Sequence, residues 1–365
     1  MILDAPILKK WWSSFICVYT YIGSMPKPLT AISNFAVTNR CNGRCNTCNI
    51  WKMDPQPDPG LDQITRFLND NRPTLRHLRF MQLTGGEPFL RDDLPAIVAA
   101  VQEALPKCMI WIPTNGLQPE RTAEMTREML LNVDDPRLGV TVSVDGEGKS
   151  HDIQRGIDGS FKLAMATLKA LSELKQRNPR LKISTGFTLT TLNYKQAPIV
   201  QLMSYRYGAD FSVRPVNISE HYYQNLGENR QMSSEDMEPV VAQMAHAVRS
   251  EKGTLRGLTN LAYLQGVKEF IAGGRTMACS AADESVFIDA AGDVYPCIVM
   301  NHRLGNAFEA PLKGILSSEE AERAREKIRR LECPTCWLEC DAYRDISRDR
   351  VKLLRALLWS LNRFS

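Results

Sequence analysis

Eight of the ten cysteines fall into two groups, and these groups constrain the fold more than any other feature of the chain. Three of them, Cys41, Cys45 and Cys48, are spaced as C-x3-C-x2-C. The second group lies toward the C-terminus and consists of Cys279, Cys297, Cys333, Cys336 and Cys340. A chain of 365 residues can bury a full hydrophobic core without disulfides. The two groups therefore predict two metal sites, and the separate Cys17 and Cys108 are predicted to be core residues.

The composition is that of an ordinary globular chain. Charged residues make up 24% and hydrophobic residues 44%, which excludes a disordered, collagen-like or coiled-coil chain. The net charge of +4 is too small to indicate nucleic-acid binding. The apolar segment 11–22 is shorter than the ~20 residues of a bilayer span, and no small-residue cleavage site follows it. Because metal-binding thiolates persist in a reducing compartment, we expect a cytoplasmic protein.

Short strand-like runs alternate with helix-like runs from residue 31 onward. The strands are predicted over residues 31–38, 80–84, 108–113, 138–144, 181–188 and 210–214. This alternation predicts an α/β fold, a partial (β/α)6 barrel whose helices lie outside a parallel sheet. Reactive residues of such barrels lie at the carboxyl ends of the strands. The first cysteine group and segments 85–88, 115–116 and 143–146 all follow strands, so they are predicted to converge on one face.

The alternation ends near residue 273, where a hairpin signal, a helix and the second cysteine group follow. We predict an N-terminal amphipathic segment (1–30), the barrel (31–272), a small Cys-rich domain (273–345) and a basic amphipathic helix (346–365). The last segment carries apolar residues at helical spacing, namely Val351, Leu354, Leu357, Leu358, Leu361 and Phe364. Both terminal segments either cap the barrel or make a peripheral contact with a membrane surface.

The first cysteine group offers three thiolates where a four-iron cluster takes four ligands, one on each iron. An open coordination position is typical of catalytic metals rather than structural ones. The alternative is a zinc knuckle that is completed by a distant residue. This alternative is disfavoured, because no histidine or fourth cysteine lies nearby in the sequence.

The segment 38–51, TNRCNGRCNTCNIW, resembles the signature of the radical S-adenosylmethionine (radical SAM) superfamily, which follows the first barrel strand. GGEP at 85–88, TNG at 114–116 and SVDG at 143–146 resemble the motifs of that family at the ends of the next three strands. One position departs from the family pattern. Thr47 stands before the third cysteine, where the family often has an aromatic residue that packs on adenine.

The resemblance implies that Cys41, Cys45 and Cys48 hold a [4Fe–4S] cluster whose open iron binds S-adenosylmethionine. It implies an enzyme that cleaves this cofactor to methionine and a 5′-deoxyadenosyl radical, which removes hydrogen from a substrate. A low-potential electron donor, a ferredoxin or flavodoxin, is then an expected partner. The residues expected to bind the cofactor are Gly85, Gly86, Glu87, Pro88, Asn115, Ser143, Asp145 and Arg214. Arg214 is equally well explained by a salt bridge inside the barrel.

The second cysteine group resembles the auxiliary-cluster domains of the same superfamily, the longer SPASM form and the shorter twitch form. Five cysteines cannot supply the eight ligands of two cubes, so we expect one auxiliary [4Fe–4S] cluster. Its expected ligands are Cys279, Cys297, Cys333 and Cys336. The role of Cys340 is undecided at this stage. It replaces one of the four ligands, stays free, or helps to hold a second, incompletely ligated cluster.

Two functions of different classes follow. The first is a radical SAM enzyme that acts on an unactivated C–H bond of a lipid, of a peptide or protein, or of a sugar or cyclitol. The second is a zinc-stabilised binding module on a barrel scaffold, without chemistry of its own. The sequence does not choose among the three substrate classes of the first.

Overall fold

The computed structural model describes residues 29–54, 56–133, 135–227, 232–248, 254–274 and 278–362. The predictions for the apolar segment 11–22 and for Cys17 lie outside the described residues. So does the prediction that Phe364 continues the apolar stripe of the tail.

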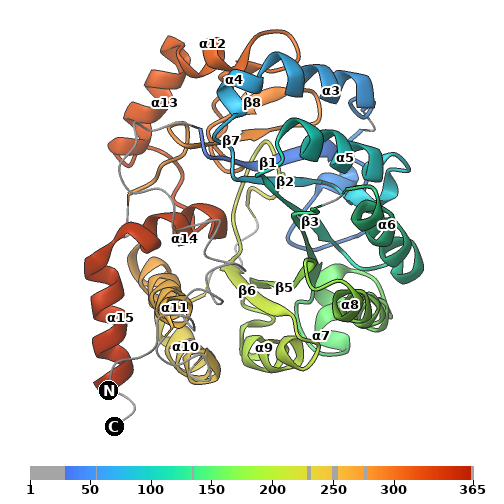
Figure 1. Ribbon diagram of the computed structural model, residues 1–365. Helices are drawn as coiled ribbons and strands as arrows, with labels where there is room; N and C mark the ends of the chain where they lie inside the picture. Colours follow the sequence, from blue (N-terminus) through green and yellow to red (C-terminus); the bar gives the residue numbers. More distant parts are fainter. Residues whose placement is uncertain are drawn as a thin grey trace, which may run out of the picture.

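A nine-stranded sheet in the order β6-β5-β4-β3-β2-β1-β7-β8-β9 organises the chain. Its first six strands are parallel neighbours. They are β1 (Ala31–Thr38), β2 (Phe80–Gly85), β3 (Met109–Thr114), β4 (Leu138–Ser143), β5 (Lys182–Leu189) and β6 (Asp210–Pro215). These bounds agree with the predicted strands to within a residue, and the predicted partial barrel is confirmed (Figure 1).

Helices fill the connections between these strands and cover the outer side of the curved sheet (Figure 1). They are α3 (Leu61–Asp70), α4 (Arg72–Leu75), α5 (Leu94–Ala104), α6 (Pro119–Leu131), α7 (Lys149–Arg155), α8 (Ser160–Arg177) and α9 (Ala197–Arg206). After β6 come α10 (Ser234–Val248) and α11 (Leu255–Gly273), which lie beside the open edge at β6 (Figure 1).

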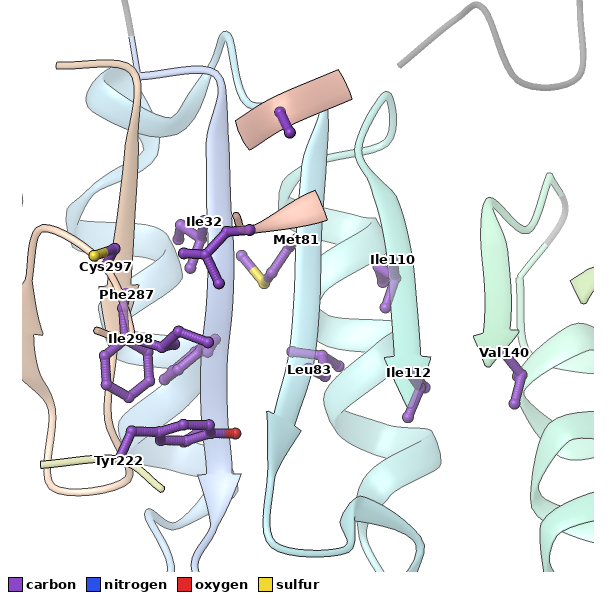
Figure 2. Packing of buried hydrophobic residues seen from close by; sticks show 14 of the residues in the cluster. Ile32, Met81, Leu83, Ile110, Ile112, Val140, Tyr222, Phe287, Cys297 and Ile298 are labelled. Carbon is purple, nitrogen blue, oxygen red and sulfur yellow. The ribbon is translucent and has the colours of Figure 1, made fainter. Parts of the chain in front are cut away.

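The core runs along the sheet. Every residue of β1 is buried, as expected for a parallel strand that is covered on both faces. Figure 2 shows apolar side chains on neighbouring strands that pack together, and those labelled on β1 to β4 are completely buried. They are Ile32, Met81, Leu83, Ile110, Ile112 and Val140. Because this close-packed core holds the six strands in place, residues at their carboxyl ends have fixed positions relative to one another.

The predicted hairpin is present as β7 (Ser285–Ile288) and β8 (Asp293–Tyr295), which pair antiparallel. It does not stand apart from the barrel, because β7 pairs in parallel with β1 and extends the same sheet. The short β9 (Gly305–Asn306) then pairs with β8. The chain continues through α12 (Leu312–Leu316) and α13 (Glu319–Arg329), which lie at the β7–β8 end of the molecule (Figure 1).

The C-terminal helix differs from the prediction because it is two helices, α14 (Glu339–Arg348) and α15 (Arg350–Asn362). The carboxylate of Asp349 accepts hydrogen bonds from the backbone of Val351 and Lys352, both at 3.0 Å, and so starts α15 anew. Helix α15 lies beside α11 (Figure 1), with Ala356 completely buried. Its apolar stripe points elsewhere, since Val351, Leu354, Leu357 and Leu358 are all exposed.

These four side chains are therefore not buried against the barrel, so the prediction that this stripe caps the barrel is wrong for them. A peripheral membrane contact stays a prediction. No helix within the described ranges is long and apolar enough to cross a membrane.

Candidate active site

The first cysteine group lies on the loop that follows β1, at the carboxyl edge of the sheet. Cys41, Cys45 and Cys48 line one cavity of about 250 Å³ that extends into the barrel. The sulfur atoms of Cys41 and Cys45 lie on the same side of Gly43, where a Cβ atom would be 3.4 and 3.6 Å from them. Burial raises the pKa of Cys41 to about 11 and that of Cys48 to about 12. Metal binding at this loop would therefore release protons.

The other predicted site residues converge on the same cavity, with one exception. Those that line it are Gly85, Gly86, Glu87, Asn115, Ser143, Asp145 and Arg214. Pro88 does not line it and instead begins the buried turn η2 (Pro88–Leu90). The lining comes from the ends of β2, β3, β4 and β6, as parallel-barrel geometry requires.

The glycine pair at the end of β2 lies directly against the backbone that leads into the cysteine loop. Gly86 N donates to Thr38 O at 2.8 Å, and Glu87 N donates to Arg40 O at 2.8 Å. A side chain on Gly85 would overlap the Thr38 carbonyl, and one on Gly86 would overlap the Arg40 carbonyl. Gly85 also has φ +125°, a conformation that only glycine adopts readily.

Glu87 joins two strand ends through its buried carboxylate. Asn115 N donates to Oε2 at 2.6 Å, and Phe89 N donates to Oε1 at 3.1 Å. Burial raises the pKa of Glu87 to about 7. Asn115 then donates through Nδ2 to Asn42 Oδ1 at 2.7 Å, on the cysteine loop. These two residues therefore hold the ends of β2 and β3 against the loop.

The carboxylate of Asp145 is fully engaged within the protein. Thr188 N donates to Oδ1 at 2.7 Å, and the Arg155 guanidinium forms an ion pair with Oδ2 at 2.7 Å. Arg155 also donates to Cys45 Sγ at 3.6 Å. Arg155 is a site residue that the sequence does not reveal, because no motif distinguishes it from other basic residues. Its position depends on the turn at Gly156, which has φ +67°.

Arg214 points into the cavity from β6. The charges that act on it include those of Tyr223, Glu339, Asp145 and Cys340. Within the described part of the chain it forms no ion pair at 4.0 Å or less. Asn217 also lines the cavity, and its buried Nδ2 has no hydrogen-bond partner among the described residues.

Of the second cysteine group, Cys340 lines this cavity, whereas Cys279, Cys297, Cys333 and Cys336 do not. Burial raises the pKa of Cys336 well above its ordinary value, and the charges that add to this shift include those of Cys297, Cys279 and Cys333. Burial also raises the pKa of Cys340 to about 12, with smaller upward contributions from Asp341 and Glu339 and downward contributions from Arg214 and Arg344. Cys340 lines the same cavity as the first group.

Trp337 explains this separation. It is 1% exposed and packs so closely on α11 that a side chain at Gly266 would overlap its ring. The chain therefore passes through the core at Trp337, directly after Cys336. Helix α14 then begins at Glu339 and carries Cys340 in its first turn.

The donor set fits iron–sulfur clusters. Three thiols share the first cavity, and four more cysteines of the second group lie outside it. A four-iron cluster takes one thiolate on each iron, so the cysteine side chains are suitable donors for such clusters.

Two family models match the chain. One describes the radical SAM superfamily and matches residues 35–203, and the other, SPASM, describes an iron–sulfur cluster-binding domain and matches residues 279–341. These matches define an enzyme that uses S-adenosylmethionine together with iron–sulfur clusters. The chain belongs to the radical SAM superfamily and carries a SPASM domain, which sets aside the zinc-stabilised, non-catalytic alternative.

Curated relatives match only part of the chain. The pre-heme d1 synthase of Dinoroseobacter shibae is 29% identical over 187 residues, 47% of this chain and 39% of that protein. The GTP 3′,8-cyclase of Klebsiella pneumoniae is 27% identical over 189 residues, 48% of this chain and 56% of that protein. The aligned regions thus span about half of these relatives or less.

Solved structures support the fold over most of the chain. Streptococcus suis SuiB bound to S-adenosylmethionine has a TM-score of 0.60 at 15% identity, covering 90% of this chain and 76% of that one. Native anSMEcpe with bound AdoMet has a TM-score of 0.60 at 13% identity, covering 90% and 98%. At such identities the likeness concerns the fold.

Proposed function

We propose that this enzyme abstracts a hydrogen atom from an unactivated C–H bond of a small polar substrate. When bound, the [4Fe–4S] cluster and S-adenosylmethionine supply the 5′-deoxyadenosyl radical for such a reaction. The observation that carries the proposal is the single cavity that joins Cys41, Cys45 and Cys48 to the interior of the barrel. A substrate bound in this cavity would therefore lie next to the cysteine loop.

The chain's own residues have distinct parts in this proposal. The three thiolates hold the cluster, and Gly85 and Gly86 let their backbone approach the cofactor closely. The guanidinium of Arg214 suits the cofactor carboxylate, because no direct ion pair within the described residues competes for it. Ser143 is the main residue for contact with the cofactor ribose, because both carboxylate oxygens of Asp145 already bind protein groups.

The barrel and the Cys-rich segment work as one unit in this proposal, since β7 continues the barrel sheet. The four thiols of the second group that lie outside the cavity hold one auxiliary [4Fe–4S] cluster, and Cys340 is a thiol of the cavity wall. An electron donor of low potential would reduce the clusters, as the chemistry of the family requires.

Cys336→Ala and Cys340→Ala form a matched pair that tests the ligand set. We expect Cys336→Ala to lose the auxiliary cluster, about four of about eight irons, because each iron of a cube takes one thiolate. Cys340→Ala should keep the iron content of the unaltered chain, because Cys340 faces the cavity. Iron analysis of anaerobically prepared protein measures both variants. Equal iron loss in the two variants would contradict the proposed ligand set.

The floor of the cavity supports a polar substrate of the sugar or cyclitol class over a lipid. Thr141 Oγ1 and Ser184 Oγ lie 2.6 Å apart, and Trp111 Nε1 donates to the same Thr141 hydroxyl. Gln82 Nε2 donates to Asn34 Oδ1 at 2.6 Å. All five residues line the cavity, where hydroxyl and amide groups next to an indole suit a polyhydroxylated ligand.

Deuterium transfer tests both the reaction and the substrate class. Polar metabolites, peptides and lipids would be prepared separately from cells grown in heavy water and incubated with reduced enzyme and S-adenosylmethionine. We expect 5′-deoxyadenosine to gain deuterium from the polar-metabolite fraction and not from the others. Transfer from lipids or peptides instead would overturn the substrate class. Continued cofactor cleavage with no transfer from any fraction would overturn hydrogen abstraction itself.

A further inference from the structure

The C-terminal end of α7 holds the cysteine loop in place. Arg44 N donates to Arg155 O at 3.2 Å, and Asn46 N donates to Gln154 O at 3.1 Å. The Asn46 side chain adds a bond from Nδ2 to Ile153 O at 3.2 Å. A side chain at Gly156 would overlap the Arg44 carbonyl, so the helix can end this close to the loop only with glycine there.

These contacts between α7 and the cysteine loop place the Arg155 guanidinium beside the thiol of Cys45. The Arg155 side chain is only 15% exposed, and its Nη1 is 3.6 Å from Cys45 Sγ. Its Nη2 is 2.7 Å from Asp145 Oδ2, and the Asp145 side chain is 3% exposed. Water therefore screens the charges of Arg155 and Asp145 less than it screens charges at the surface.

Asp145 is itself held in a fixed position. Its second oxygen accepts from Thr188 N at 2.7 Å, and its backbone N donates to His151 Nδ1 at 3.0 Å. His151 is completely buried, and burial lowers its pKa to about 4, so it stays neutral near pH 7. The charged groups that face Cys45 through this arrangement are thus one arginine and, behind it, one aspartate.

We propose that Arg155 sets the reduction potential of the cluster held by Cys41, Cys45 and Cys48, and that Asp145 limits its effect. The inference rests on the proposed function in that the loop must hold this cluster. Reduction adds negative charge to the cluster and its thiolates. A hydrogen-bond donor and cation at Cys45 stabilises the reduced form and raises the potential, whereas the carboxylate behind it opposes this.

The opposite signs of the two charges give the test. Redox titration of the full-length enzyme, followed by electron paramagnetic resonance, measures the potential of each cluster. We expect Arg155→Gln to shift the first cluster to a more negative potential and Asp145→Asn to shift it to a more positive one. Arg155→Lys keeps the charge and loses the forked donor geometry, so its negative shift should be smaller. The auxiliary cluster is an internal control and should not shift in any variant.

Lys149→Gln is the matched control, because Lys149 is exposed on the same helix and the substitution removes the same charge. It should leave both potentials unchanged. Shifts of Arg155→Gln and Asp145→Asn in the same direction, or no shift in either, would overturn the inference. Asp145→Asn and Arg155→Lys keep the test decisive if Arg155→Gln does not fold. Absence of the first cluster from the unaltered enzyme would instead overturn the proposed function.

Discussion

Replacement of Cys41, Cys45 and Cys48 by alanine is expected to abolish reductive cleavage of S-adenosylmethionine and to leave the auxiliary cluster in place. The three residues lie on a loop after β1 and are only partly buried, so their truncation removes the thiolates without emptying the core. The auxiliary thiols lie on a different part of the chain, between Cys279 and Cys336. About four of about eight irons should remain, which iron analysis measures alongside the release of 5′-deoxyadenosine.

Cys108→Ala is the control for loss of a cysteine as such. Cys108 is completely buried and does not line the cavity, so this variant should keep its iron and its cofactor cleavage. Continued cleavage by the triple variant would show that the radical site lies elsewhere. Loss of all iron from the triple variant would show that the two clusters do not bind independently.

Gly85→Ala is expected to produce the second large effect, a loss of cofactor binding together with lower stability. Alanine is strained at φ +125°, and its Cβ atom would overlap the Thr38 carbonyl at the start of the cysteine loop. Backbone strain and overpacking together should destabilise the fold by about 3 kcal/mol. Anaerobic thermal unfolding and equilibrium dialysis with S-adenosylmethionine measure the two consequences.

Gly314→Ala is the matched substitution, since a Cβ atom at Gly314 in α12 would meet nothing within 4 Å. It should bind the cofactor normally and keep or slightly raise the stability, because alanine favours a helix by up to about 1 kcal/mol over glycine. Normal cofactor binding and unfolding of Gly85→Ala would contradict the close approach of β2 to the cysteine loop.

The sequence predicts the barrel well because its strands are short apolar runs between helices. Strand β1 is buried on every residue, and such strands are recognised without knowledge of their neighbours. The convergence of Cys41, Gly85 and Asn115 followed from the same topology, since the carboxyl ends of parallel strands share an edge. Local pattern and strand order together therefore located most of the candidate site.

Contacts between segments that lie far apart in the sequence could not be predicted from it. Arg155 reaches Cys45 across 110 residues, and no periodicity reports such a contact. The pairing of β7 with β1 depends on which edge of the sheet was still open, and local propensity does not specify this. The placement of Cys340 in the cavity depends on the packing of Trp337 against α11, so the spacing of the cysteines alone left its role undecided.

The metal content of the unaltered chain tests the central claim most directly. Protein purified without oxygen should be brown, absorb broadly near 400 nm and contain about eight irons, which corresponds to one four-iron cluster at each cysteine group. Such protein should contain only traces of zinc. A colourless protein with stoichiometric zinc and no iron would contradict the assignment of both sites.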